Sequence, residues 1–325
     1  MKVGPMNLDS VRLFLEVADA GSLSKVAARR QTVQSHISRQ VADFEANCGG
    51  RLFHRTGRGV VLTELGERAA ARLRIWLHET EQLTEEMRAD AGHVMGEVRL
   101  GILPSAAHPL MTRLFARLQA QHPGIRLSIA EAQGAELDSM LDGGTVDLAI
   151  LFRFRRPSGR EEKLLCEAHT YLVSAPGDPL TREATLDFIR LRDLRLVLPR
   201  RPGQWRQALD ETARGLGFRL EAVVEADSLT AQKELVANTP GLYAVLGPYA
   251  FAAEVQRGQL QVCQVVKPDL CRHVVLALPR HGKFSAACRV VADAVQSIIA
   301  SWEHQLTEPV KHQSVERGKG KKVRS

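Results

Sequence analysis

The fold of the N-terminal part is decided by residues 22–62, SLSKVAARRQTVQSHISRQVADFEANCGGRLFHRTGRGVVL. Apolar residues recur there at helical spacing: Val33, Ile37, Val41 and Phe44. The opposite face carries hydrogen-bonding side chains with little acid: Gln34, Ser35, Ser38, Arg39 and Gln40. A shorter helix before it can begin at Ser22, a suitable N-cap residue. Two helices joined by a tight turn, with donors and acceptors on the second, fit the major groove of DNA.

The segments on either side complete a small domain. Residues 8–17 carry an apolar stripe, and Gly21 is a natural end for that first helix. On the other side, apolar pairs flank the turn at residues 55–59, RTGRG. This pattern predicts a two-stranded wing with Arg55 and Arg58 at its tip.

Residues 63–92 are expected to form one long helix. Its apolar positions step by an average of 3.5 residues: Ala69, Leu73, Trp76, Thr80, Leu83 and Met87. A period of 3.5 predicts a left-handed seam between two helices, and hence a homodimer. The alternative is an amphipathic helix that lies on the core of its own chain.

From residue 97 onward, short strands alternate with helices. Strands are expected at 98–102, 126–130, 148–152, 171–174, 196–198, 222–225 and 243–246. Helices are expected at 109–121, 136–142, 204–214, 229–237 and 284–302. This βαβ rhythm predicts two α/β lobes with largely parallel sheets. Ligands of such folds bind at strand C-termini and between lobes.

The net charge of +7 lies at the two ends of the 325-residue chain. Residues 1–60 hold nine basic against five acidic side chains, and residues 309–325 hold six against one. A charged terminal module is typical of nucleic-acid contact, whereas a basic tail is more often a solubilising, disordered end.

No apolar run is long enough to span a membrane and no secretory signal opens the chain, so we expect a cytoplasmic protein with no membrane partner.

Residues 6–67 resemble the DNA-binding domain of LysR-type transcriptional regulators. The resemblance is carried by ADAGS at 18–22, SRQ at 38–40 and LFHRTGRGVVLT at 52–63. It extends to about residue 302 and implies a mixed fold: an α-helical winged helix-turn-helix domain, a long linker helix, and a bilobed α/β domain similar to periplasmic solute-binding proteins. The implied boundaries are 1–65, 66–93 and 94–302, followed by a basic disordered tail at 303–325. Lobe I would comprise about 94–168 and 268–302, and lobe II about 169–267.

The resemblance also implies partners. Members bind an interrupted inverted repeat in promoter DNA as a homotetramer, and a small molecule between the lobes alters that binding. By position, Gln34, Ser35, Ser38 and Arg39 would approach the major groove, and Arg55 and Arg58 would lie near phosphate. We expect Gln34 to read adenine, although it can instead cap its helix. His36 departs from the family pattern and either contacts DNA or lies at the rim of the helix.

An anionic effector is the expectation for the cleft. Ser105, Ser228 and Thr230 lie at helix starts directly after strands, where free backbone N–H groups favour anions. Arg200 and Arg201 follow another strand and add positive charge. The serines can instead be ordinary N-caps, and the arginines can form surface salt bridges.

Other functional classes have little support. The α/β region contains no GxGxxG, Walker, GxSxG or HExxH motif, so we expect neither an enzyme nor a cofactor. Eleven histidines are scattered without metal-ligand spacing. Five cysteines (Cys48, Cys166, Cys263, Cys271 and Cys288) form no CxxC pair and suit buried thiols. Two alternatives remain open: a cysteine-based redox-sensing regulator, and a cytosolic small-molecule-binding protein without a DNA role.

Overall fold

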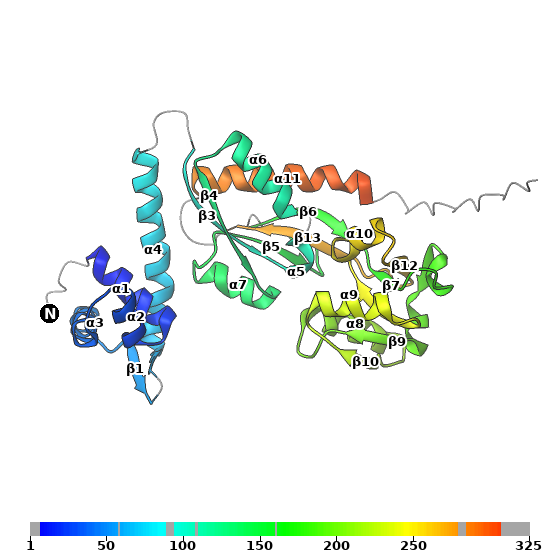
Figure 1. Ribbon diagram of the computed structural model, residues 1–325, viewed down its shortest axis with the longest axis horizontal. Helices are drawn as coiled ribbons and strands as arrows, with labels where there is room; N and C mark the ends of the chain where they lie inside the picture. The colour runs from blue at the N-terminus through cyan, green and yellow to red at the C-terminus, as the bar shows by residue number, and fades with distance from the viewer. Residues whose placement is uncertain are drawn as a thin grey trace, which may run out of the picture.

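The computed structural model describes residues 7–57, 59–88, 94–107, 110–159, 161–278 and 284–306. Figure 1 shows a small helical domain and one long helix on one side of the molecule, and two sheet-containing lobes on the other. The architecture is therefore a helical N-terminal domain, a linker helix and a bilobed α/β region, which is the mixed fold expected from the sequence.

The N-terminal domain is a three-helix unit with a wing. Its elements are α1 (Leu8–Ala20), α2 (Leu23–Arg29), α3 (Gln34–Cys48), β1 (Phe53–Thr56) and β2 (Gly59–Leu62). Gly21 ends α1 in the left-handed conformation at φ +59°, and Ser22 caps α2 by accepting from the backbone N–H of Lys25. The Phe14 ring stacks on Phe44 of α3 and packs against Phe53 of β1, with centroids 5.4 and 5.3 Å away. This aromatic core fixes the wing relative to α3.

The linker helix α4 (Glu64–Arg88) packs partly on its own chain. Ala70 and Leu73 are buried in the core of the N-terminal domain, whereas Trp76 and Leu83 are 38% and 57% exposed. The seam expected from the 3.5-residue period is therefore divided, because Leu73 belongs to the intrachain core while Trp76 and Leu83 face outward. The side chain of Met87 lies outside the described residues.

The same helix also touches lobe I. His78 Nε2 lies 2.9 Å from Asp147 Oδ1, and Arg99 Nη2 lies 2.7 Å from the same carboxylate oxygen. The Asp147 side chain is only 6% exposed. A buried carboxylate thus joins helix α4 to lobe I.

Lobe I is built on a five-stranded sheet in the order β4-β3-β5-β13-β6. Its strands are β3 (Gly96–Ile102), β4 (Ile125–Glu131), β5 (Leu148–Arg153), β6 (Glu162–Ala168) and β13 (Arg272–Ala277). Its helices are α5 (Pro104–Ala107), α6 (Leu110–Gln121), α7 (Gly134–Asp142) and α11 (Ala286–Leu306). In Figure 1, α6 and α11 lie on one side of the sheet and α7 on the other.

Lobe II has a six-stranded sheet in the order β10-β9-β11-β7-β12-β8. Its strands are β7 (Tyr171–Ser174), β8 (Thr185–Asp187), β9 (Arg195–Leu198), β10 (Ala222–Glu225), β11 (Leu242–Leu246) and β12 (Gln261–Val266). Its helices are η1 (Leu180–Arg182), η2 (Phe188–Asp193), α8 (Gln204–Gly215), α9 (Leu229–Asn238) and α10 (Pro248–Gln256).

The sheets are less parallel than the sequence predicted. Strand β13 runs antiparallel to both β5 and β6, and β7 runs antiparallel to β11 and β12. The physical reason is that the chain passes from lobe I to lobe II after β6 and returns before β13, so the connecting strands enter the sheets against the direction of the βα units. Their direction and register depend on strands that are distant in the chain, which a local hydrophobic pattern does not encode.

The C-terminal helix is longer than the sequence predicted. Helix α11 continues to Leu306, so the first residues assigned to a disordered tail, 303–306, are helical, while 307–325 lie outside the described residues. Within the described ranges, no helix is both long enough and apolar enough to cross a membrane.

Candidate nucleic-acid interface and interlobe cleft

Helix α3 presents a polar face to solvent. Ile37, Val41 and Phe44 are buried in the domain core, as the helical spacing predicted. Gln34, Ser35, His36 and Arg39 are exposed, and Ser38 is half-buried. Val33, expected in the apolar stripe, is instead 65% exposed, because it is the extended N-cap residue and lies before the first helical turn.

Two local contacts hold the start of α3. The Gln34 Oε1 atom accepts a hydrogen bond from Ser24 Oγ of α2 at 2.9 Å, which leaves the amide NH2 group directed elsewhere. Val33 has no side-chain capping bond, so the structure does not show Gln34 capping its own helix. His36 Nδ1 lies 3.3 Å from Thr32 Oγ1. Helix α2 therefore positions the Gln34 side chain, and the turn that precedes α3 positions His36.

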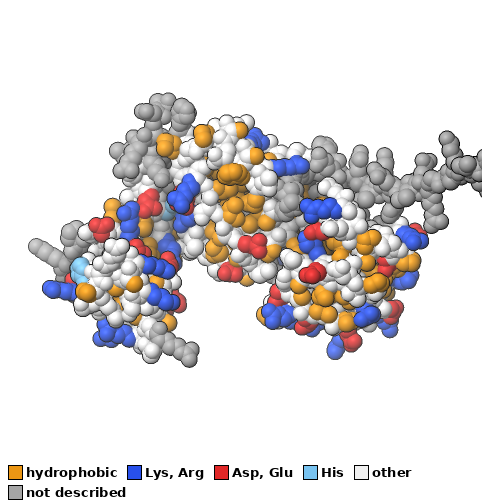
Figure 2. Space-filling model, in the orientation of Figure 1, with side chains coloured by type: hydrophobic (Ala, Val, Ile, Leu, Met, Phe, Trp, Pro, Cys, Tyr) orange, Lys and Arg blue, Asp and Glu red, His pale blue; other side chains and the backbone are white. Residues whose placement is uncertain are grey.

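The wing is tied directly to this helix. Arg55 Nη2 donates to Ser38 Oγ at 2.9 Å, so a strand of the wing and the middle of α3 form one continuous surface. Glu45 on the same helix turns inward and accepts from the backbone N–H groups of Leu52 and Phe53. Arg58 lies outside the described residues. Figure 2 shows several Lys and Arg side chains on the N-terminal domain.

The facing edges of the two lobes form the second candidate site. Strands β3 and β5 of lobe I run parallel, as do β9, β10 and β11 of lobe II, and helix α5, which follows β3, contacts helix α10, which follows β11. Cys166 Sγ of lobe I lies 2.7 Å from the hydroxyl oxygen of Tyr249 in lobe II. The Phe154 and Trp205 rings stack across the lobes with centroids 6.2 Å apart.

The arginines expected in the cleft already have partners. Arg200 Nε donates to Asp227 at 2.7 Å, and Arg201 Nε donates to Asp210 at 2.7 Å. The Arg200 side chain is 68% exposed and that of Arg201 is 58% exposed. Hydrogen bonds from Arg200 hold the pKa of Asp227 below its usual range. Both arginines are thus surface ion pairs in this structure, the alternative that the sequence left open.

The hydroxyl residues have local roles. Ser228 is the N-cap of α9 and accepts from the backbone N–H of Ala231 at 3.3 Å, while Thr230 is exposed in the first turn. Ser105 is half-buried in α5, a helix of only four residues that contacts α10 of the other lobe. Ser105 therefore lies where the lobes meet. Ser228 is an ordinary N-cap, because its side chain accepts a hydrogen bond from the first turn of its own helix.

Sequence reasoning missed the most unusual residue of the cleft, Arg272. It opens β13, is 5% exposed, and its Cζ lies 4.2 Å from the Trp205 ring centroid and 4.8 Å from that of Phe152. Its Nε has no hydrogen-bond partner among the described residues. Burial lowers the pKa of Arg272 to about 10. The only sequence signal was a single arginine just ahead of the apolar run at 274–278.

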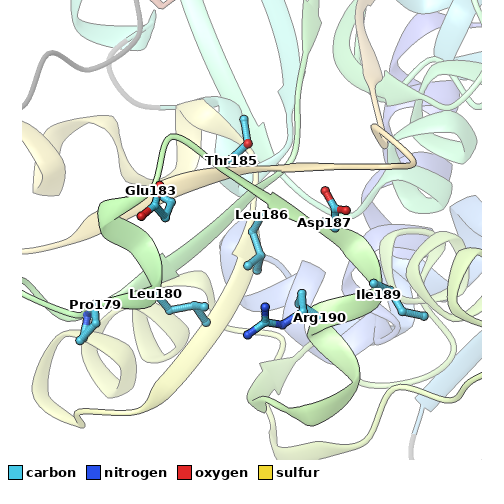
Figure 3. Close-up of a pocket in the computed structure, with 8 residues that line it drawn as sticks. All are labelled: Pro179, Leu180, Glu183, Thr185, Leu186, Asp187, Ile189 and Arg190. Carbon is cyan, nitrogen blue, oxygen red and sulfur yellow. The ribbon is translucent and has the colours of Figure 1, made fainter.

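Among the described residues, two of the surface pockets are relevant to the search for a binding site. One, of about 320 Å³, is formed around β8 by residues 179–190, where Leu180, Leu186 and Arg190 point toward one another (Figure 3). The other, of about 540 Å³, is formed by residues 153–162 and has Phe154 as one wall. Neither pocket is lined by the effector residues expected from the sequence.

Four of the five cysteines have a thiol pKa above its usual value. Burial raises the pKa of Cys263 to about 12 and that of Cys288 to about 11, and it also raises the pKa of Cys48 and Cys271. Among the described residues, no group of three or more His, Cys, Asp or Glu side chains is placed to hold a metal ion.

The chain matches known proteins over most of its length. The model of the bacterial regulatory helix-turn-helix protein, lysR family, matches residues 8–67, and the LysR substrate binding domain model matches residues 91–299. The chain is 24% identical over 297 residues to the nitrogen assimilation regulatory protein nac of Escherichia coli, covering 91% of this chain and 96% of that protein. It is 31% identical over 284 residues to a probable hydrogen peroxide-inducible genes activator of Streptomyces viridosporus, covering 86% of this chain and 90% of that protein.

A solved structure shares the fold. A full-length OxyR variant from Pseudomonas aeruginosa superposes with a TM-score of 0.70 at 22% identity, covering 91% of this chain and 95% of that one. At that identity the likeness concerns the arrangement of the domains and lobes, and not the chemistry of any site.

Proposed function

This chain belongs to the LysR family of DNA-binding transcriptional regulators, and from that premise we propose that a small anionic effector held between its lobes controls its binding to promoter DNA. The DNA-binding role follows from family membership, which removes the alternative of a binding protein without a DNA role. The family consists of regulators rather than enzymes. The effector, the residues that bind DNA and the oligomeric state are parts of the proposal.

We assign the DNA-binding residues chiefly from the hydrogen bond that Arg55 of the wing donates to Ser38 of α3. It holds the polar face of α3 and a wing cation on one surface, which supports insertion of α3 into the major groove with the wing beside a phosphate. Gln34 is our residue for direct readout, since a glutamine side chain can pair bidentately with adenine. Arg39, Arg55 and Arg58 supply phosphate affinity, while Ser35, His36 and Ser38 line the same approach.

A gel shift on the DNA upstream of the protein's own gene tests this assignment. We expect Gln34→Ala to relax specificity at one base step by about 1–3 kcal/mol while nonspecific binding stays intact. Gln40→Ala, on the same helix and also exposed, is the matched control. Uniform weakening on all DNA would reject the readout role of Gln34.

The effector assignment rests on the meeting edges of the lobes. Ser105 lies in α5, which contacts α10 of lobe II, and Arg200, Arg201, Ser228 and Thr230 follow strands β9 and β10 of that lobe in the chain. An anion at this place would compete with Asp227 and Asp210 for the two arginines. Thermal shift of the full chain against small carboxylates tests the proposal, because a ligand that binds only the folded state raises the melting temperature.

The assembly that we propose is a homodimer through α4, paired into a homotetramer on an interrupted inverted repeat. Trp76 and Leu83 supply exposed apolar surface on α4 for a second helix. Sedimentation equilibrium distinguishes a tetramer from a dimer or a monomer, and a monomeric chain at micromolar concentration would contradict this assembly.

A redox-sensing regulator is the alternative function, favoured by the likeness to a probable hydrogen peroxide-inducible genes activator. A peroxide sensor needs a thiolate, and burial raises the pKa of Cys263 and Cys271 instead of lowering it. We therefore expect peroxide to leave the DNA footprint unchanged. A footprint that changes with peroxide in the wild type, but not after Cys-to-Ser replacement, would establish the alternative.

A further inference from the structure

Arg272 is a buried cation, and no Asp or Glu side chain in the described part of the chain forms an ion pair with it. Arg200, Arg201 and Arg206 of the neighbouring lobe each form an ion pair with an aspartate or glutamate, and Arg206 is as deeply buried as Arg272. The guanidinium of Arg272 lies beside the rings of Phe152 and Trp205, and its Nε makes no hydrogen bond among the described residues. A buried charge without a counter-ion lowers the stability of the folded state, so binding of an anion beside Arg272 would be favourable.

The backbone around Arg272 adds positive potential. Trp205, which stacks on the guanidinium, is the second residue of α8, and Nη2 lies so close to Gly247, the N-cap of α10, that a Cβ there would be 1.9 Å away. Neither helix has a side-chain cap or an acidic residue in its first turn. The positive end of the α10 dipole therefore lies at a buried cation, a combination that favours a negative ligand.

We propose that Arg272 is the residue that binds the effector's carboxylate, and that the effector is a small carboxylate with a flat, apolar body. The inference rests on the proposed function, which places an anion between the lobes, but it moves the anion from Arg200 and Arg201 to Arg272. The flat body follows from the walls: Phe152 belongs to lobe I and Trp205 to lobe II, and their rings lie beside the guanidinium.

A surface pocket lies next to the Trp205 ring that covers the guanidinium. Phe154 is a wall of the 540 Å³ pocket and stacks on the same Trp205 ring that covers Arg272. Arg155 and Arg156 line that pocket, together with Glu161 and with Glu162, whose carboxylate is held by Arg153. Because Phe152 and Trp205 come from different lobes, binding as proposed requires an opening of the lobes that separates the two rings and uncovers Arg272.

The test uses the full chain with benzoate as the probe and benzamide as its uncharged counterpart. We expect benzoate to raise the melting temperature of the wild type saturably, and benzamide to have no effect. Arg272→Met is expected to weaken benzoate binding by about 10- to 100-fold, because charge-assisted hydrogen bonds are lost. Arg214→Met, which removes an exposed arginine from the last turn of α8, is the control and is expected to keep the full benzoate response.

A second measurement needs no ligand. Replacing an unpaired buried charge by an apolar side chain of similar length leaves stability unchanged or raises it, whereas removing a structural clamp lowers it. We therefore expect the ligand-free melting temperature of Arg272→Met to equal or exceed that of the wild type. A clear fall, a benzoate response that survives in Arg272→Met, or a wild type that ignores benzoate would each overturn the inference.

These outcomes are separable from failure of the proposed function. A benzoate response lost in Arg200→Met but kept in Arg272→Met would overturn the present inference and leave an anionic effector in the cleft. If no small carboxylate at all shifts the melting temperature, the anionic effector itself fails.

Discussion

The carboxylate of Asp147 should carry much of the connection between the linker helix and lobe I. It accepts hydrogen bonds from the Arg99 backbone N–H and guanidinium, both at 2.7 Å, and lies 2.9 Å from His78 Nε2 of α4. We expect Asp147→Asn to destabilise the folded chain. Removing one partner of a buried ion pair costs about 3–5 kcal/mol, and we reduce this to about 2–4 kcal/mol because Arg99 and His78 are 25% and 18% exposed.

At 2–4 °C per kcal/mol for a domain of about 200 residues, this loss corresponds to a melting temperature lower by about 4–16 °C. Differential scanning calorimetry of the full chain at pH 7 measures it, with Glu131→Gln, an exposed acid of lobe I, as the control. A drop no larger than that of the control would refute the view that Asp147 holds α4 to the lobe.

The pH dependence gives the same experiment a second readout. Burial raises the pKa of Asp147, but hydrogen bonds from His78 and Arg99 lower it by more, so the net pKa lies below its ordinary value of 3.8. A carboxylate with a depressed folded pKa stabilises the protein above its unfolded pKa and loses that contribution as the pH falls through the folded value. The difference between wild type and Asp147→Asn should therefore be full at pH 7 and shrink only below about pH 4.

Two further predictions concern the DNA-binding domain. Gly66→Ala should destabilise this domain by about 1–3 kcal/mol, because its Cβ would lie 2.1 Å from the backbone oxygen of Leu52. Chemical denaturation monitored by DNA binding measures this loss of stability. Gly57→Ala is the control and should leave stability unchanged, because its Cβ would meet nothing within 4 Å. Arg55→Ala should weaken binding about equally on all DNA sequences and reduce the slope of log affinity against log salt by about 1. A sequence-dependent loss would assign Arg55 to base readout instead.

The sequence by itself determined the local features of this protein. The helical spacing of Ile37, Val41 and Phe44 placed α3, and Gly21 and Ser22 placed the boundary between the first two helices. These signals are readable because periodicity and capping act over a few residues along one chain segment. The motifs at 18–22, 38–40 and 52–63 identified the family on the same local basis.

Only the tertiary structure decided which charges are free. Arg200 and Arg201 looked like cleft cations in the sequence, yet Asp227, 27 positions away, and Asp210 neutralise them. Arg272 carried no motif, and its isolation comes from Trp205 and Phe152, which are distant in the chain and belong to different lobes. Burial and ion pairing depend on contacts between remote segments, so the position of the unpaired charge is a property of the folded chain and not of any stretch within it.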